Sequence, residues 1–152
     1  MKLRMRDAVA SDAIMIASHN QAMAYETEHE ELDIEITLAG VRAVLNDLKL
    51  GRYLVAELGN KVVGNLMITY EWSDWRNRMM WWIQSVYVKP EFRGQGVYTA
   101  MHRHVLRLAE AEGVQKVRLY AVADNEKAHR VYRKMGMSNE AYVMFEQFTT
   151  GD

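Results

Sequence analysis

Pro90, the only proline of the chain, separates a predicted buried strand from a predicted helix. Residues 81–88 are apolar on both alternating faces with two exceptions, as in a central strand that is covered on both sides. Proline cannot donate to a strand ladder and therefore ends this strand. Apolar side chains at spacings of four and three over 97–108 then predict a helix with one buried face. A strand, a turn and a helix in this order are typical of an α/β fold.

The remaining pattern places further elements on both sides of this unit. We expect a strand over 3–7, a helix after Ser11-Asp12, an irregular acidic connector over 26–35 and a helix capped by Thr37. Further strands are expected over 52–57 and 61–70 around a Gly59-Asn60 turn, over 117–122 and over 141–148, with a helix ending near Gly136 before the last of them. This order predicts a mixed sheet with helices on its faces, in a single domain over residues 1–152.

Composition excludes several classes of function. The 19 basic and 20 acidic side chains give a net charge of -1, whereas a general nucleic-acid binder carries a basic surplus. The chain has no cysteine, which excludes disulfides, thiolate catalysis and cysteine-bound zinc. Its densest apolar run, residues 79–83, is far shorter than the roughly 20 residues of a membrane-spanning helix, and the N-terminus lacks the apolar block of a signal peptide. We therefore expect a cytoplasmic protein without a nucleic-acid or membrane partner.

The loop after Pro90 has the composition of an anion-binding turn. Gly94 and Gly96 allow the backbone to approach a ligand closely, and Arg93 supplies a positive charge. The helix that follows adds about half a positive charge at its N-terminus, so the N–H groups of this loop can bind pyrophosphate. An ordinary turn before a helix is the alternative interpretation. The spacing is neither a Walker P-loop nor a Rossmann fingerprint.

Two motifs in this half of the chain resemble the GNAT family of acetyl-CoA-dependent N-acetyltransferases. The family's pyrophosphate motif, Gln/Arg-x-x-Gly-x-Gly/Ala after a strand ending in x-Val-x-Pro, is matched from Val86 to Gly96, while Tyr98 stands where the family has Gly or Ala. The family's second motif, Asn-x-x-Ala-x-x-x-Tyr-x-x-x-Gly-Phe, is matched from Asn125 onward, with Met137 in place of the final Phe. Both motifs occur in the family's order.

The resemblance implies a GNAT acyltransferase fold, with a mixed, mostly antiparallel central sheet flanked by helices. Splayed central strands would form the cleft for acetyl-CoA, which would be the co-substrate, without a metal. The pantetheine arm would pair with backbone groups of the central strand. The residues that would bind the cofactor are Val86, Tyr87, Val88, Arg93, Gly94, Gln95, Gly96, Val97, Tyr98, Asn125 and Tyr132.

The implied reaction is direct attack of a primary amine of a small molecule or peptide on the acetyl thioester, in a ternary complex. The resemblance assigns Tyr132 as the proton donor to the leaving thiolate. The proton acceptor stays open, because residues 81–88 contain no acid. Glu71 and Asp74 are the nearest candidates along the chain. The other candidates are Glu26, Glu28 and Glu30, or ordered water without a protein base.

The acceptor amine is not specified by the sequence. Trp72 and Trp75, together with Glu28 of the acidic connector, are candidate acceptor-binding residues, and they favour a cation such as a polyamine or a basic amino acid. Arg76 and Arg78 in the same segment oppose that interpretation. Core or dimer packing would also explain the tryptophans, and we expect a homodimer as one possible assembly.

Other chemistries lack their motifs. His102 and His104 are two residues apart on a predicted helix and point to different faces, and the chain contains no His-Glu-x-x-His or Gly-x-Ser-x-Gly motif. We therefore expect no metal site and no acyl-serine chemistry. A non-catalytic acyl-CoA binding or sensing module of the same fold is the alternative to an enzyme.

Overall fold

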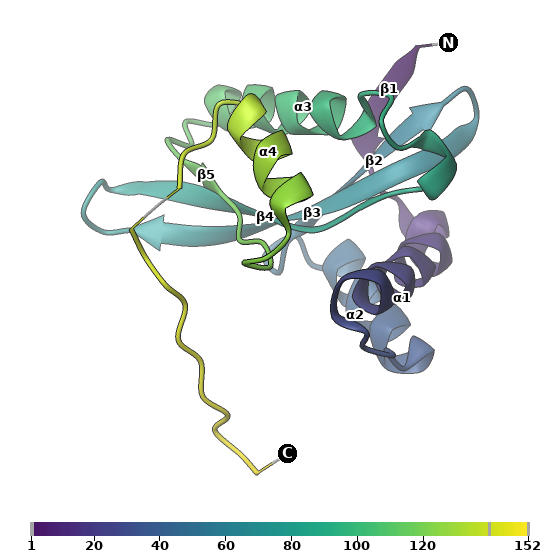
Figure 1. Cartoon of the computed structure of the whole chain (residues 1–152), viewed down its shortest axis with the longest axis horizontal. Coiled ribbons are helices and arrows are strands. Elements are labelled where there is room, and N and C mark those ends of the chain that lie inside the picture. The colour runs from purple at the N-terminus through teal and green to yellow at the C-terminus, as the bar shows by residue number, and fades with distance from the viewer. Residues whose placement is uncertain (1, 140, 152) are drawn as a thin grey trace. The chain divides into compact units, whose positions relative to one another are not determined.

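A five-stranded mixed sheet in the order β1-β2-β3-β4-β5 is the framework of the chain up to Tyr120 (Figure 1). Its strands are β1 (Leu3–Asp7), β2 (Arg52–Leu58), β3 (Lys61–Ser73), β4 (Arg78–Val88) and β5 (Val117–Arg118). Neighbouring strands are antiparallel except β5, which runs parallel to β4. The computed structural model describes residues 2–139 and 141–151, and those from Ala121 onward form a second compact unit. The predicted α/β fold with a mixed sheet is confirmed.

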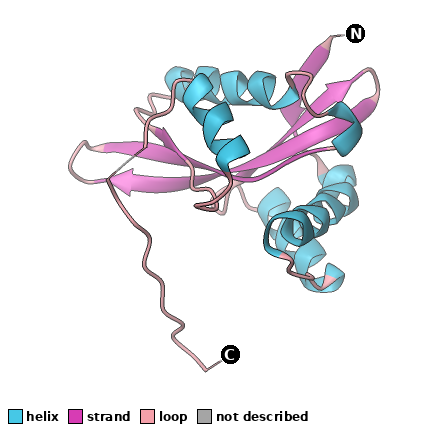
Figure 2. Ribbon diagram, in the orientation of Figure 1, coloured by secondary structure: helices cyan, strands magenta, loops and turns pink. Residues whose placement is uncertain are grey.

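Helices cover both faces of this sheet, and alternation along β2 shows which helix covers which face. Leu54 packs in the cluster that contains α3 (Val97–Ala111). Its neighbours Tyr53 and Val55 pack in the cluster formed with α1 (Ala13–Glu28) and α2 (Ile34–Asn46). Because successive side chains of a strand point to opposite faces, α3 lies on one face and α1 with α2 on the other, as Figure 2 shows.

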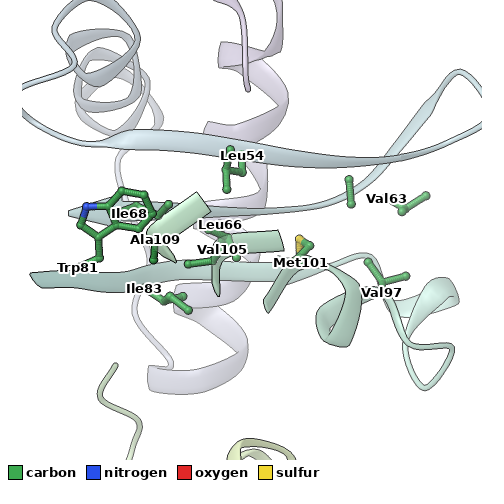
Figure 3. Packing of buried hydrophobic residues seen from close by; sticks show 11 residues of the cluster. Leu54, Val63, Leu66, Ile68, Trp81, Ile83, Val97, Met101, Val105 and Ala109 are labelled. Atoms are coloured by element: carbon green, nitrogen blue, oxygen red, sulfur yellow. The ribbon is translucent and has the colours of Figure 1, made fainter. Parts of the chain in front are cut away.

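The core on the α3 face fixes where this helix begins. Its side chains at spacings of four are at most 4% exposed and pack on buried residues of β2, β3 and β4 (Figure 3). The helix residues are Val97, Met101, Val105 and Ala109. Gly64 on β3 allows both β4 and the first turn of α3 to pack closely, since a Cβ there would lie 2.9 Å from the carbonyl oxygen of Tyr87 and 3.4 Å from a side-chain carbon of Val97. The N-terminus of α3 is thereby held next to the C-terminal end of β4.

The acidic connector is shorter than expected. Helix α1 continues through Glu28, and α2 begins at Ile34. The carboxylate of Asp33 accepts the N–H groups of Glu35 and Ile36, so Asp33 caps α2 and the predicted cap Thr37 lies inside the helix. The acidic side chains of this segment are solvent-exposed, so water and salt screen their repulsion and the helical pattern prevails.

The second unit contains α4 (Glu126–Lys134), which ends before Gly136 as predicted. The strand expected over 117–122 is only two residues long, Val117–Arg118. The prediction of a strand over 141–148 is wrong, because the described residues 141–151 form neither helix nor strand. Alternating apolar residues form a strand only when another strand supplies hydrogen bonds, and none lies within the described part of this unit.

No helix in the part of the chain that the structure describes combines the length and the apolar character needed to cross a bilayer.

Candidate functional site

The edge of β4 that faces β5 is paired over only part of its length. Pairing begins at Trp81, opposite Val117, and ends at Trp82, opposite Arg118. Strand β4 continues to Val88, and within the described first unit no strand pairs with this continuation on the β5 side. The C-terminal half of β4 therefore keeps backbone groups available for an added extended chain.

A β-bulge turns one backbone N–H of this half toward the open edge. Asn65 pairs with Tyr87 and Met67 with Gln84, so the two β4 residues Ser85 and Val86 lie opposite a single β3 residue. Ser85 adopts a left-handed backbone with φ of 50°. The Asn65 side-chain amide on β3 donates to the Ser85 carbonyl at 3.4 Å. The C=O and N–H of a trans peptide point in opposite directions, so the N–H of Val86 points away from β3.

The loop between β4 and α3 presents consecutive unused N–H groups. After the short 3-10 helix Pro90–Phe92, Gly94 and Gly96 adopt φ of 73° and 82°, which glycine reaches without strain. Gly96 is the N-cap of α3 and supplies no side chain to cover the helix end. Among the described residues, the N–H groups from Gly94 to Val97 donate to no carbonyl or side chain. This turn can therefore bind an anion with its backbone.

Arg93 joins this loop to two other elements. Its Nε donates to the carbonyl of Val88 at 2.8 Å, and its Nη2 lies 2.9 Å from a carboxylate oxygen of Glu26 on α1. The guanidinium also lies over the ring of Tyr87, with 5.3 Å between them. Part of the predicted cationic group is therefore used to hold the loop against the end of β4.

Tyr98 occupies the motif position where the family has a small residue. Its hydroxyl lies 2.9 Å from Nδ1 of His102, one turn further along α3, and the two rings meet edge to face. His102 is buried, and burial lowers its pKa, so the imidazole is neutral at pH 7. The larger side chain at position 98 is thus accommodated along the helix.

The sequence patterns did not identify two buried residues that lie next to this loop, His19 and Asn65. His19 on α1 is 7% exposed, and its Nδ1 lies 2.5 Å from Oδ1 of Asn65, which is fully buried. The imidazole also stacks on Tyr87 with 4.7 Å between ring centres. The only available signal for His19 was its place three residues after Ile16, on the buried side of α1. Asn65 gave no signal, because the bulge that uses its side chain is a property of the paired strands.

Three of the candidate acceptor and base residues lie far from the glycine loop. Trp72, Asp74 and Trp75 occupy the hairpin between β3 and β4, where Ser73 pairs with Arg78. Arg78 and Val88 lie at opposite ends of β4, so the hairpin is roughly 30 Å from the glycine loop at about 3.3 Å per residue. Trp72 and Trp75 are largely exposed there.

The carboxylates named as candidate bases have different surroundings. Glu71 accepts the indole N–H of Trp82 at 2.7 Å and lies 3.6 Å from Arg118. Glu26 is paired with Arg93, whereas Glu28 is exposed at the end of α1. Asp74 is exposed in the hairpin. None of these four carboxylates is buried as a desolvated general base would be.

Asn125 and Tyr132 belong to the second unit. Oδ1 of Asn125 accepts the N–H of Ala128 at 3.1 Å and thereby caps α4, on which Tyr132 lies. Burial raises the pKa of Tyr132, so its hydroxyl keeps its proton at neutral pH. Within the described ranges, no three His, Asp or Glu side chains are grouped as a metal site requires.

Comparison with known proteins gives consistent matches. A sequence model of the acetyltransferase (GNAT) family matches residues 14–137. The crystal structure of a possible acetyltransferase from Clostridium difficile 630 is 36% identical, with a TM-score of 0.92 over 99% of both chains. A predicted acetyltransferase from Clostridium acetobutylicum, solved with acetyl-CoA, has the same fold at 19% identity and a TM-score of 0.78, over 96% of both chains.

Curated relatives match over a shorter segment. Thialysine N-epsilon-acetyltransferase of Bos taurus is 32% identical over 78 residues, which are 51% of this chain and 45% of that protein. The same enzyme of Mus musculus matches over the same share of each chain. The chain thus spans about half the length of these curated relatives.

Proposed function

Since the chain belongs to the acetyltransferase (GNAT) family, we propose that it is an N-acetyltransferase that moves the acetyl group of acetyl-CoA to a primary amine of a small molecule or peptide. The observation that carries this proposal is the run of unused N–H groups from Gly94 to Val97 beside the unpaired edge of β4. Residues 94–96 are exposed, and the glycine turn places these groups together with the N-terminus of α3, which is the arrangement in which backbone N–H groups bind an anion.

In this proposal the backbone holds the co-substrate. The loop from Arg93 to Tyr98 binds the diphosphate through its N–H groups and the N-terminus of α3. The backbone of Val86, Tyr87 and Val88 pairs with the pantetheine arm as an added strand would. Asn125 and Tyr132 are assigned to the arm and the sulfur by the family motif that they match.

The chain's own groups then assist the transfer. The N–H of Val86 stabilises the negative charge that develops on the carbonyl oxygen during attack. The hydroxyl of Tyr132 supplies a proton to the departing thiolate, consistent with the pKa that burial raises. A primary amine with a pKa near 10 must also lose a proton, which costs about 4 kcal/mol at pH 7. The reaction therefore requires a proton acceptor.

Two measurements on the purified chain test this function. Titration calorimetry with CoA measures binding, and release of free thiol from acetyl-CoA measures transfer to an amine. The amine panel contains polyamines, lysine, thialysine, acidic amino acids and short peptides. We expect saturable binding and turnover with at least one amine. Binding without turnover on any amine would support the sensing module instead, and no CoA affinity would contradict both interpretations.

A further inference from the structure

We propose that His19 is the proton acceptor of the transfer, and that its Nε2 removes the proton that the incoming amine must lose. This inference rests on the proposed function and names a residue that lies outside both family motifs. It is drawn from four features of the described first unit: the tautomer of His19, its charge state, its place beside the bulge of β4, and the surroundings of the carboxylates.

The tautomer of His19 follows from its hydrogen bonds. The Ser85 carbonyl can only accept, so the NH2 group of Asn65 must face Ser85 at 3.4 Å. The other end of this carboxamide, Oδ1, therefore faces His19, and it can also only accept. Nδ1 of His19 must then carry the hydrogen, at 2.5 Å from Oδ1. In the neutral ring this leaves a lone pair on Nε2.

Nε2 is available to a ligand. Among the described residues it makes no hydrogen bond, and it is not one of the fully buried polar atoms that lack a partner. The small exposed part of this residue therefore includes Nε2. The next residue on α1, Asn20, does have a fully buried Oδ1 without a partner in the described chain. A buried water at this position would satisfy that oxygen.

The surroundings keep His19 uncharged at neutral pH. Burial is the main cause that lowers the pKa of His19, and the nearby positive charge of Lys89 acts in the same direction. The hydrogen bond to Asn65 opposes these two effects only in part. From β4, the group in contact is the ring of Tyr87, and Arg93 over the same ring is paired with Glu26. A neutral imidazole can accept a proton, whereas an imidazolium cannot.

His19 is linked to the proposed reaction centre by a single side chain. Asn65 binds His19 at one end of its carboxamide and the Ser85 carbonyl at the other. The N–H of Val86, which belongs to the same peptide unit as that carbonyl, is the group assigned to the developing negative charge. Asn65 thereby fixes the orientation of both the proposed proton acceptor and the peptide unit whose N–H is assigned to the developing charge.

The carboxylates that were candidate bases are less suitable proton acceptors than His19. Glu71 is engaged by Trp82 and Arg118, and Glu26 by Arg93. Asp74 is exposed in the hairpin, at the opposite end of β4 from the glycine loop. His19 differs from all three, because it is buried, neutral and has an unused lone pair.

The proton balance of the step is complete. The amine arrives as an ammonium, and Nε2 of His19 takes one proton from it. The new N–C bond forms as the C–S bond breaks. Tyr132 gives its proton to the thiolate and recovers one from the acetylated nitrogen. His19 finally releases its proton to solvent, so one proton is produced for each acetyl group transferred.

The test is the variant His19→Asn, whose side-chain NH2 can take the place of Nδ1 toward Asn65 while no group replaces Nε2. We expect kcat to fall about 100-fold with the CoA dissociation constant within about twofold of wild type. The acid limb of the wild-type pH–rate profile, which lies below the ordinary histidine pKa, should disappear. The variant rate should instead rise about tenfold per pH unit up to the amine pKa near 10, because the ammonium must then lose its proton to solvent before it can react. His104→Asn on α3 is the matched control and should keep the wild-type profile.

The outcomes separate this inference from the proposed function. Wild-type turnover together with an unchanged pH profile in His19→Asn would overturn the inference alone. Absence of wild-type transfer to any amine, with or without CoA binding, would overturn the function and the inference together. If the variant does not fold, nitrogen NMR of the wild-type imidazole decides the matter at pH 7. A neutral ring with the hydrogen on Nδ1 supports the proposal, and a hydrogen on Nε2 overturns it.

Discussion

Nη2 of Arg93 lies 2.9 Å from a carboxylate oxygen of Glu26, so the glycine loop before α3 is tied to the last turns of α1. Both side chains of this ion pair are 40% exposed, and such pairs contribute little to stability. Its effect on binding is expected to be larger, because Glu26 places a negative charge next to the loop that would hold a diphosphate.

Removal of this charge should strengthen CoA binding. For Glu26→Gln we expect the dissociation constant to fall by about twofold to fivefold, as Coulomb attraction between the loop and the diphosphate is no longer offset. Calorimetry at two salt concentrations measures the change, which should shrink as salt increases. Glu28→Gln removes the same charge from the same helix and should have a smaller effect. An equal gain in both variants would show that net charge, and not the contact with Arg93, is responsible.

A side chain at Gly96 should disturb both the loop and its ligand. The backbone there has φ of 82°, and a Cβ would meet no atom within 4 Å, so the cost of Gly96→Ala is backbone strain alone. We expect a loss of about 1 kcal/mol in the free energy of unfolding, together with at least tenfold weaker CoA binding. Gly40→Ala, in the interior of α2, should instead gain about 0.5–1 kcal/mol. Unchanged CoA affinity in Gly96→Ala would contradict the assignment of the loop.

The hydroxyl of Tyr132 should matter for turnover and much less for binding. Because burial raises the pKa of this phenol, it remains a proton donor to a higher pH than an ordinary tyrosine. Tyr132→Phe should lower kcat about 100-fold, and CoA affinity should change by less than about threefold. Steady-state kinetics and calorimetry provide both values, with Tyr142→Phe as the control in an exposed position of the same unit. A wild-type kcat in Tyr132→Phe would rule out its role as the acid.

Acid should weaken the contact between Arg6 and Asp12. Asp12 accepts hydrogen bonds from the Arg6 guanidinium at 2.8 Å and from the N–H of Val9 at 2.8 Å, and these lower its pKa. The unfolded chain therefore takes up the proton first, so this stabilisation is present at neutral pH and is lost as the pH falls below about 4. Asp12→Asn should cost about 1.5–3 kcal/mol at pH 7. In urea titrations the difference from wild type should narrow below pH 4, and a difference independent of pH would show that charge is not involved.

Local patterns in the sequence were sufficient to predict those strands, turns and helices whose formation depends on neighbouring residues. Pro90 ended a strand, Gly59-Asn60 formed the hairpin turn, and the stripe from Val97 to Leu108 became the buried face of α3. The predicted helix boundaries were wrong where two residues could each cap the same helix. Asp33 rather than Thr37 caps α2, because its carboxylate reaches two N–H groups and the acidic residues around it are solvated.

The sequence by itself determined the strand–loop–helix unit around Pro90, since glycine φ angles, proline and helix spacing act over a few residues of the chain. Only the tertiary structure decided that His19, Asn65 and Ser85 form one hydrogen-bonded chain, in which the first two are 46 positions apart in the sequence. That contact depends on the register of β3 against β4 and on the bulge between them. A shift of one residue would turn Asn65 to the other face of the sheet, and no local pattern encodes that choice.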